Sequence, residues 1–470
     1  MTVVSMLQGK SLCVLNTLIV PLAVSVFAVP VGIAAQDSQS WRVTDAMFPA
    51  GDERKEELGR LLFFDKILSG NENISCASCH HPFAATGDGL SLPVGTGGTG
   101  FGVARETSGQ LGQQVFERVP RNAPALFNLG ADDFSVLFHD GRLAVDHNQP
   151  SGFLNPAGDD LPSNLESVLA AQAMFPVTSA AEMAGQPGEN AIADAAAANN
   201  LAGADGVWAL LADRLRANTE YVDLFIEAFE HIDSAADISY QDASNAIGAF
   251  EAAAYRCTDT PFDRAVGSDG ALQQKSWKDS LSPKVIRGEK LFYGKAQCAD
   301  CHSGPFQTDQ SFHAIAVPQV GPGKGDGADG HDDFGRERVT ADAADRYKFR
   351  TPSLRQVAYT GPWGHDGAYN SLVDMIKHHL NPVEALENYD TSQLVLASRP
   401  DLDAQDLIAH NDPAHRADIA AANELERIPL DAGEIGDIVE FLRIGLTDTS
   451  CTDLRRDVPQ RVPSGIPIAD

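Results

Sequence analysis

The chain has 470 residues, of which 43% are hydrophobic and 21% are charged, which excludes a disordered chain and a collagen-like repeat. Its 65 acidic and 35 basic residues give a net charge of −30, which repels phosphate backbones and excludes nucleic acid as an expected partner. This charge either steers a basic protein toward the surface or only keeps the chain soluble, and the sequence leaves both interpretations open.

The first segment has the pattern of an export signal. Residues 1–10 carry one lysine and no acid, and residues 11–35 contain no charged residue and end in Ala34 and Ala35. This pattern predicts a signal peptide over 1–35 that is cleaved near Ala35, although an uncleaved segment of this length would span a membrane. No later segment is comparably apolar, so we expect a soluble mature protein in the periplasm.

The rest of the chain is predicted to be mainly α-helical. Apolar residues recur at mostly helical spacing over 205–232 and 240–255. The same spacing returns over 431–445, where Asp431 is the expected N-cap. Alternating strand patterns are scarce, so the fold class is helical with few strands.

Two long segments are predicted to be loops. Residues 86–113 are rich in glycine, and their GxGxxG match at 95–100 lacks the flanking strand and helix of a dinucleotide site. Residues 318–336 are rich in glycine and aspartate. Their acidic residues do not follow the EF-hand spacing, so we expect a solvated loop rather than a calcium site. These residues are Asp326, Asp329, Asp332 and Asp333.

Two segments have the sequence CxxCH. They are Cys76, Cys79 and His80, and then Cys298, Cys301 and His302. This spacing attaches a c-type haem through two thioether bonds and supplies a histidine ligand to the iron. A redox CxxC is typical of a βαβ setting, and a zinc site would need two further ligands nearby. The chain has neither pattern, so we predict two covalently bound c-type haems.

Three further cysteines remain. Cys13 lies in the expected signal peptide. An oxidising compartment permits a disulfide between Cys257 and Cys451 that would fix the C-terminal tail. The sequence gives no distance between these two residues, so the pairing is left open.

The landmarks around the two CxxCH motifs occur twice in the same order. In each half a segment that ends in Leu-Phe comes first, over 58–63 and 287–292, and the CxxCH motif, an Arg- and Pro-containing motif and His-Asp-Gly follow. The haem histidine precedes His-Asp-Gly by 59 residues in the first half and by 63 in the second. We therefore predict two cytochrome-c-like domains related by internal duplication and joined by long loops. They cover 36–255 and 256–448, and a tail covers 449–470.

One helix carries a candidate axial ligand of a haem iron. Leu372, Met375, Ile376 and His379 fall at i, i+3, i+4 and i+7 and share one helical face, whereas His378 lies about 100° away. His379 is therefore expected to point into a core. The alternatives are a core histidine that only bonds the backbone, or Met375 as the ligand.

These residues resemble the bacterial di-haem cytochrome c peroxidases and the related MauG-type enzymes. The resemblance runs from about Leu58 to Leu446. Besides the two CxxCH motifs it rests on Arg121 to Pro124, His139 to Arg142, Gln172, Glu182, Met183, Phe349 to Arg355 and Thr360 to Gly367. It implies that the N-terminal haem reduces hydrogen peroxide to water. It also implies that electrons enter through the C-terminal haem from a small cytochrome or copper protein. The related enzymes are often dimers, so a homodimer is the expected assembly.

The resemblance assigns catalytic roles to residues of the first half. Glu182, ten residues after Gln172, matches the distal acid–base residue of the family, and Gln172 belongs to the same site. Splitting an O–O bond requires a proton to be taken from one oxygen and delivered to the other. A carboxyl group in a partly desolvated pocket can do both, because burial raises its pKa. The alternative is an ordinary surface glutamate.

The resemblance also assigns metal ligands. His379 lies 14 residues after His365, which matches the position of the distal ligand on the C-terminal haem. His80, His302 and His379 are therefore the expected iron ligands. The side chain of Asn122 and the backbone oxygens of Thr360 and Pro362 match the calcium site of the family, and such oxygen donors suit calcium.

Three positions depart from the family pattern. The peroxidases usually have methionine and MauG has tyrosine at the position of His379, so histidine would give a bis-histidine iron of lower potential. His139 replaces the tryptophan between the haems, where it takes part in electron transfer or ligates iron. Gln114 replaces the removable distal histidine of many peroxidases, so the N-terminal haem is expected to be open without reductive activation.

Three functions agree with this sequence. The first is a peroxidase that uses an external electron donor, which the acid–base residue favours. The second is a MauG-like oxidant of a protein or organic substrate, because a fold does not fix a function. The third is a di-haem electron carrier, which would need two six-coordinate haems.

Overall fold

The computed structural model of the chain describes residues 41–107, 114–266 and 281–469. The expected signal peptide over 1–35 and Cys13 lie outside the described residues. Within these three ranges, none of the helices has the length and apolar character needed to cross a bilayer. The chain from residue 40 onward forms a single unit of contacts.

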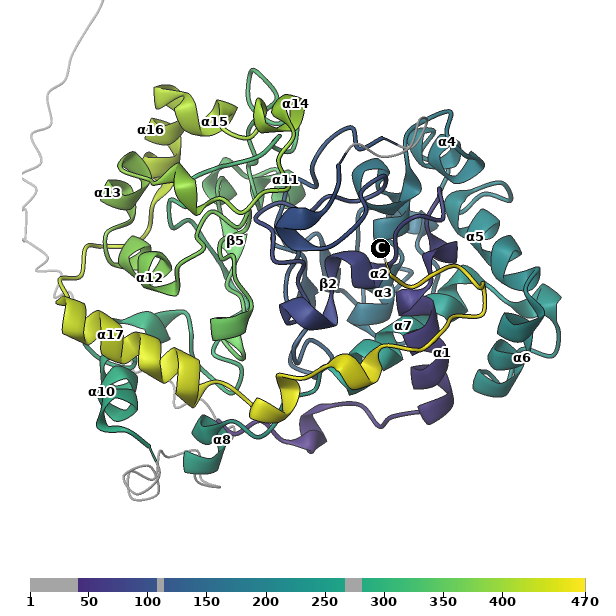
Figure 1. Cartoon of the computed structure of the whole chain (residues 1–470), viewed down its shortest axis with the longest axis horizontal. Helices are drawn as coiled ribbons and strands as arrows, with labels where there is room; N and C mark the ends of the chain where they lie inside the picture. The colour runs from purple at the N-terminus through teal and green to yellow at the C-terminus, as the bar shows by residue number, and fades with distance from the viewer. Residues whose placement is uncertain (1–40, 108–113, 267–280, 470) are drawn as a thin grey trace, which may run out of the picture. The chain divides into compact units, whose positions relative to one another are not determined.

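Helices dominate the described chain, as the sequence predicts (Figure 1). Those before residue 256 are α1 (Glu53–Phe64), α2 (Cys76–Cys79), α3 (Val168–Ala173), α4 (Ala191–Ala197), α5 (Val207–Arg216), α6 (Thr219–Ala228) and α7 (Tyr240–Ala254). Those after it are α8 (Pro261–Ala265), α10 (Pro283–Phe292), α11 (Glu337–Thr340), α12 (Leu372–Leu380), α13 (Pro382–Glu387), α14 (Pro400–Asp403), α15 (Ile408–Asn411), α16 (Pro413–Ala422) and α17 (Ala432–Glu440).

The strands of the described chain are only two or three residues long. Three of them form an antiparallel sheet in the order β1-β2-β3, in which Ala144 pairs with Val136 on one side and Leu154 on the other. The other two form an antiparallel pair in which Phe312 faces Arg350. Their bounds are β1 (Val136–Leu137), β2 (Leu143–Val145), β3 (Phe153–Leu154), β4 (Phe312–His313) and β5 (Phe349–Arg350).

The predicted helices are found with one change. The helical spacing over 205–232 corresponds to two helices, α5 and α6, because Asn218 interrupts the run and caps α6 through the amide of Tyr221. The prediction over 240–255 is confirmed by α7. Asp431 is the N-cap of α17, as predicted, and its carboxylate accepts bonds from the amides of Gly433 and Glu434.

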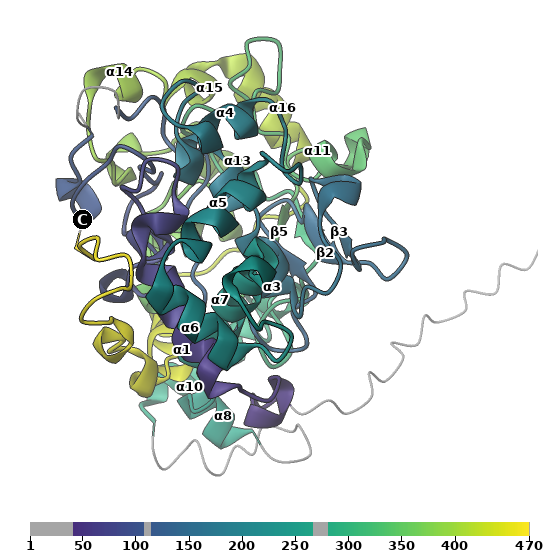
Figure 2. The same ribbon diagram turned by 90° about the vertical axis from the view of Figure 1, so that its right-hand side faces the viewer.

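Each half contains a pair of helices that touch at a glycine. α1 packs against α7, and α10 packs against α17 (Figures 1 and 2). A Cβ atom on Gly59 of α1 would lie 1.9 Å from the carbonyl oxygen of Ala246. A Cβ atom on Gly288 of α10 would lie 1.9 Å from the carbonyl oxygen of Asp437. Only glycine lets the two backbones of each pair come this close.

Two large apolar cores lie beside the two CxxCH motifs. The larger is built mainly from residues between Val43 and Cys257 and includes the packed rings of Phe63, Phe250 and Tyr255. The smaller is built from residues between Phe262 and Leu446. The division into domains at residues 255 and 256 stays a prediction.

The C-terminal tail returns to the first half of the chain (Figure 1). Cys257 and Cys451 form a disulfide with a Cα–Cα distance of 6.1 Å, which confirms the pairing that the sequence left open. Beyond it, Ser464 Oγ donates a 2.7 Å hydrogen bond to Asp65, and Lys66 Nζ donates one of 2.9 Å to the carbonyl of Ala469. The tail is therefore fixed to Cys257 where it begins and to Asp65 and Lys66 where it ends.

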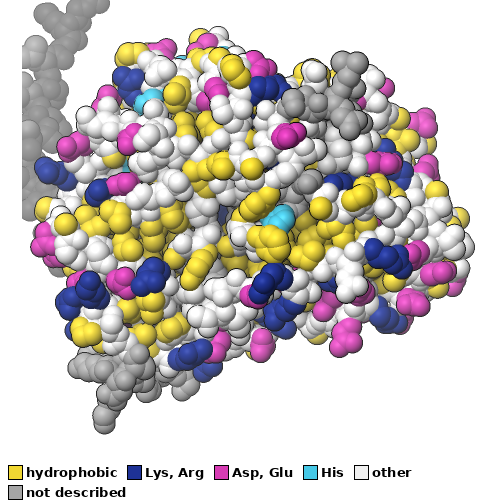
Figure 3. Space-filling model, in the orientation of Figure 1, with side chains coloured by type: hydrophobic (Ala, Val, Ile, Leu, Met, Phe, Trp, Pro, Cys, Tyr) yellow, Lys and Arg dark blue, Asp and Glu magenta, His cyan; other side chains and the backbone are white. Residues whose placement is uncertain are grey.

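The surface shows both signs of charge despite the net charge of −30. On the face in Figure 3, acidic and basic side chains are interspersed around a central area of apolar side chains. This face therefore carries no single-signed field that would select a basic partner.

Candidate active site

The first CxxCH motif folds into a tight helical turn. Cys76–Cys79 forms α2, which Ser75 and Ser78 cap reciprocally, and the amide of His80 donates a 2.9 Å bond to Cys76 O. Nδ1 of His80 lies 3.0 Å from the carbonyl oxygen of Thr86. Because the carbonyl holds Nδ1, Nε2 is the nitrogen that can bind a metal. Burial lowers the pKa of His80, which favours the neutral form that a metal requires.

The second motif repeats this geometry. Its first three residues, Cys298–Asp300, form a 3₁₀ turn, and the amide of His302 donates a 2.9 Å bond to Cys298 O. Nδ1 of His302 lies 3.0 Å from Gln307 O, which again leaves Nε2 for the iron.

His379 faces the second motif from α12. The ring centroids of His302 and His379 are 6.3 Å apart, and Nδ1 of His379 lies 2.9 Å from Met375 O. Two imidazoles bound at about 2 Å on opposite sides of one metal have centroids about 6 Å apart, so the pair fits a bis-histidine haem iron. Burial and then His379 lower the pKa of His302 to about 4, so both rings are held neutral.

The neighbouring histidine has a different role. His378 is fully buried although it lies away from the face of His379, because a second part of the chain covers that side of α12. Its Nδ1 lies 2.8 Å from Tyr369 Oη and its Nε2 lies 2.7 Å from Ile315 O. Both nitrogens are occupied, so His378 fixes α12 rather than binding iron. Met375 packs against the apolar cluster that contains Tyr369.

Glu182 is held in a short π-helix over Ala180–Ala184. Its amide bonds Ser179 Oγ, and its carbonyl accepts a 2.9 Å bond from the amide of Thr96. The side chain of Glu182 is half-buried, so it differs from an ordinary surface glutamate. Burial raises the pKa of Glu182, while the positive charges of Arg142 and Lys324 oppose the rise.

The glycine-rich loop supports this π-helix. A Cβ atom on Gly95 would lie 2.0 Å from Ala181 O and 2.9 Å from the Cα of Glu182. The segment that matched GxGxxG is therefore a packing surface for the acid–base candidate. Its first glycine is needed because the two backbones are in direct contact.

Sequence reasoning missed Lys324. It comes from the loop over 318–336 in the second half of the chain, and it interacts with Glu182 of the first half. No local pattern marks it, because the interaction joins residues far apart in the sequence. The expectation of a solvated acidic loop is only partly confirmed. Asp329 is exposed, but Asp332 and Asp333 are 3% and 4% exposed, and Arg121 of the first half binds Asp333.

An ion-pair network fills the space beside Glu182. Arg121 contacts Asp333 and Asp140 at 2.7 Å each, and Arg142 contacts Asp140 at 3.1 Å. Burial opposes ionisation, but Arg121 and then Arg142 lower the pKa of Asp140 to about 2. Arg142 also covers the ring of Phe138 at 3.6 Å. The network fixes the position of the charge that Arg142 presents to Glu182.

The other predicted site residues lie on both sides of this network. Gln172 is the half-buried residue of α3, whose other residues are buried. Nε2 of His139 lies 3.1 Å from Asn122 O, and the amide of Asn122 donates a 2.9 Å bond to His365 O. His365 stacks on Phe349 with centroids 3.6 Å apart. His139 and Asn122 are thus brought together with the second His-Asp-Gly motif.

Asn122 is the calcium candidate whose side-chain contacts are defined. Its Nδ2 donates bonds of 2.8 Å and 3.2 Å to the carbonyls of Leu90 and Ser91, which leaves the side-chain oxygen Oδ1 as the atom that would bind a cation. Thr360 and Pro362 lie just before the His365 segment that Asn122 contacts. Calcium binding by these residues stays a prediction.

Known proteins resemble this chain in sequence and fold. The sequence model described as di-haem cytochrome c peroxidase matches residues 53–271. The methylamine utilization protein MauG of Methylorubrum extorquens is 31% identical over 331 residues, which are 69% of this chain and 68% of that protein. The chain belongs to the di-haem cytochrome c peroxidase and MauG family.

Two further relatives belong to the same two groups of proteins, the peroxidases and the MauG-like proteins. Cytochrome-c peroxidase IdrP1 of Pseudomonas sp. (strain SCT) is 26% identical over 343 residues, which are 68% of this chain and 70% of that protein. The crystal structure of a MauG-like protein associated with microbial copper homeostasis matches with a TM-score of 0.57 and 26% identity, covering 90% of this chain and 97% of that one. A di-haem family implies two c-type haems, and both peroxidases and MauG occur among the relatives.

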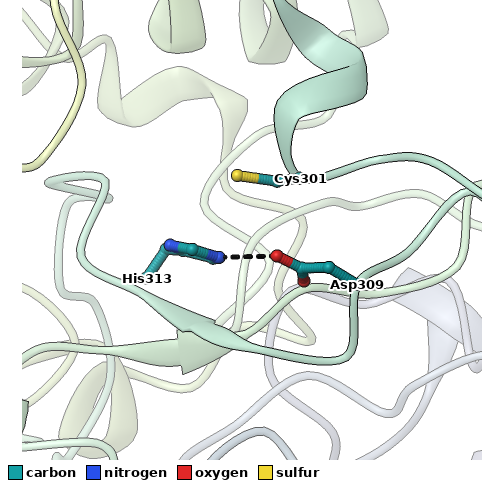
Figure 4. A group of neighbouring side chains, drawn as sticks. All are labelled: Cys301, Asp309 and His313. Atoms are coloured by element: carbon teal, nitrogen blue, oxygen red, sulfur yellow. Dashed lines mark hydrogen bonds and ion pairs between the residues drawn. The ribbon is translucent and has the colours of Figure 1, made fainter. Parts of the chain in front are cut away.

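Membership in this family explains a cluster beside the second motif. Cys301, Asp309 and His313 place one ligand atom each within 4.8 Å of the others, and Nε2 of His313 lies 2.9 Å from Asp309 (Figure 4). The sulfur of Cys301 belongs to the haem attachment motif, so this group is not a separate metal site. Asp309 and His313 would instead lie beside the thioether bond that Cys301 forms when a haem is attached.

Proposed function

We propose that this chain is a periplasmic peroxidase that reduces hydrogen peroxide to water at the haem of His80. Electrons would enter through the haem of His302 from a small cytochrome or copper protein. The proposal is supported by the second imidazole, that of His379, which faces His302. For the first centre, the family resemblance makes the carboxyl of Glu182, whose pKa is raised by burial, the distal group.

The chemistry requires two electrons and two protons for each peroxide that becomes two waters. When bound, haem iron supplies the electrons to the O–O bond. Glu182 would take the proton from one peroxide oxygen and deliver it to the other, which leaves as water, and two protons from solvent would complete the second water. Burial raises the pKa of Glu182, and the charges of Arg142 and Lys324 limit this rise. Such a balance suits a carboxyl group that accepts a proton and then donates it. Gln172 would orient the peroxide through its amide.

The second centre would serve electron transfer. His302 and His379 would keep its iron six-coordinate, and bis-histidine ligation gives a lower potential than His/Met ligation. His139, which bonds the backbone beside His365, would lie on the route between the haems. A calcium ion bound by Asn122, Thr360 and Pro362 would join the two halves along this route.

The proposed architecture is a duplication. The domains would cover 36–255 and 256–448, with the tail over 449–470. The matching contacts of Gly59 and Gly288, and of His80 and His302 with backbone carbonyls, support this division. Cleavage of the segment 1–35 would release the chain into the periplasm, where it is proposed to be a homodimer.

A second function is supported by the 31% identity to MauG. In that case the oxidised haems would act on a protein or organic substrate instead of an electron donor. MauG-type ligation by tyrosine would favour this function, but the residue that faces His302 is a histidine.

The experiment that decides between them uses the holoprotein with both haems. Fully oxidised and half-reduced protein is mixed with hydrogen peroxide and a reduced small cytochrome, beside Glu182→Gln and the exposed control Glu230→Gln. We expect rapid oxidation of the cytochrome that falls by about 10²–10⁴-fold in Glu182→Gln and not in the control. A long-lived oxidised species with no donor oxidation would support the MauG-like function. Two low-spin haems and no reaction would leave only an electron carrier.

A further inference from the structure

The structure brings a second group of metal-ligand side chains together, far from the haem motifs in sequence. Asp329, Asp412 and His415 place one ligand atom each within 4.8 Å of the others. Asp329 lies in the loop over 318–336. Asp412 is the N-cap of α16, and His415 lies in the first turn of that helix (α16 in Figures 1 and 2).

A fourth side chain, that of Asp332, lies beside His415, and one of its two oxygens lacks a hydrogen-bond partner. Asp332 is 3% exposed, and its Oδ1 is buried with no hydrogen-bond partner. Its Oδ2 lies 3.4 Å from Nε2 of His415, and that nitrogen lies 3.9 Å from Oδ1 of Asp329. A buried carboxylate oxygen without a donor is unfavourable, and a cation among these atoms would satisfy it.

The surroundings of Asp332 do not supply this cation. Burial raises the pKa of Asp332, and the carboxylates of Asp329, Asp326 and Asp418 raise it further, while His415 lowers it. Asp326 is already engaged by Arg338 and by the amide of Phe334. The carboxylates that remain near His415 therefore repel one another, which a bound divalent ion would relieve.

The backbone holds Asp332 in this position. Its amide and carbonyl pair with the carbonyl and amide of Asp326, and the same carbonyl accepts a 2.8 Å bond from the amide of Lys324. These bonds fix the backbone from which the side chain of Asp332 extends.

We propose that Asp329, Asp332, Asp412 and His415 bind a divalent first-row metal ion such as Mn²⁺ or Zn²⁺. Ligand atoms at about 2.2 Å from one ion are at most about 4.4 Å apart. The ligand atoms of Asp329, Asp412 and His415 lie within 4.8 Å of one another, so they require only small shifts, and Asp332 Oδ2 would join them from its place 3.4 Å from His415. Three carboxylates suit manganese and an imidazole suits the first-row metals, whereas calcium prefers oxygen ligands alone. None of these residues belongs to the haem motifs or to the calcium candidates.

Binding would tie the loop to α16. The same loop carries Lys324, whose amide bonds Asp332 O and whose charge acts on Glu182. A bound ion would thus stabilise the segment that supplies part of the electrostatic environment of the acid–base candidate. This consequence rests on the proposed function, whereas the metal site does not.

The test is a titration of the holoprotein with MnCl₂ after chelation and return of calcium. Free Mn²⁺ is counted by its room-temperature electron paramagnetic resonance signal. Asp412→Asn retains an N-cap residue, so α16 should still form, and His415→Gln removes the imidazole. Asp418→Asn is the control, because it removes an equal charge from the same helix without removing a proposed ligand. The haem absorption and melting temperature of each variant report its folding.

We expect stoichiometric binding of one Mn²⁺ per chain. Its affinity should fall about tenfold or more in Asp412→Asn and in His415→Gln, and much less in Asp418→Asn, whose charge acts on Asp332 without binding the ion. The proposal would be overturned if the holoprotein bound neither Mn²⁺ in this titration nor Zn²⁺ in a parallel titration with ZnCl₂. Equal losses in Asp412→Asn and Asp418→Asn, which indicate diffuse attraction, would overturn it as well, and so would displacement of Mn²⁺ by an equal concentration of calcium.

Discussion

Gly95→Ala tests whether the glycine-rich loop positions Glu182. Gly95 does not have the positive φ angle that favours glycine, so alanine is compatible with its backbone. The substitution therefore acts through the contacts of the new Cβ atom. The new Cβ atom would lie 2.0 Å from Ala181 O and 2.6 Å from Glu182 O. Cβ atoms essentially never approach closer than 3.0 Å, so one backbone must move by about 1 Å.

The magnitude follows from this displacement. A shift of about 1 Å in a catalytic group can lower a rate by about 10²-fold, so peroxide turnover should fall by this order. The same overpacking should lower the free energy of unfolding by about 1–3 kcal/mol. The Thr96–Glu182 backbone bond of 2.9 Å should weaken with it.

The assay compares oxidation of a reduced small cytochrome by peroxide in the wild type, Gly95→Ala and Gly436→Ala. No atom lies within 4 Å of a Cβ on Gly436 in α17, so this control has the same chemical change without the contact. Haem absorption spectra show whether both centres stay intact. If Gly95→Ala turns over at the wild-type rate with intact haems, the loop does not position Glu182 and the reasoning is refuted.

Two further predictions concern charge and ligation. Lys324→Met removes a positive charge that, with Arg142, lowers the pKa of Glu182. The acid limb of the pH profile of kcat/KM should therefore move to higher pH, and the exposed control Lys284→Met should leave it in place. An unmoved profile would show that Lys324 does not act on the acid–base group. His379→Met should raise the potential of the second haem in a redox titration, because a thioether ligand gives a higher potential than imidazole. An unchanged potential would mean that His379 does not bind the iron.

Features set by neighbouring residues could be read from the sequence. CxxCH is complete within five residues, so haem attachment needs no distant partner. The helical spacing from Leu372 to His379 and the N-cap Asp431 also depend on local geometry, and both helices are found. The spacing over 205–232 predicted helix but not the break at Asn218, because capping can end a helix within an apolar pattern.

Only the tertiary structure decided which distant residues meet. It paired Cys257 with Cys451, brought Lys324 to Glu182 and buried Asp332 beside His415. None of these contacts has a local signal, because each depends on how a long loop or tail folds back on the other half. The sequence by itself determined the chemistry of the two haem centres. The fold determined their electrostatic surroundings, since burial and charge depend on neighbours in space and not along the chain.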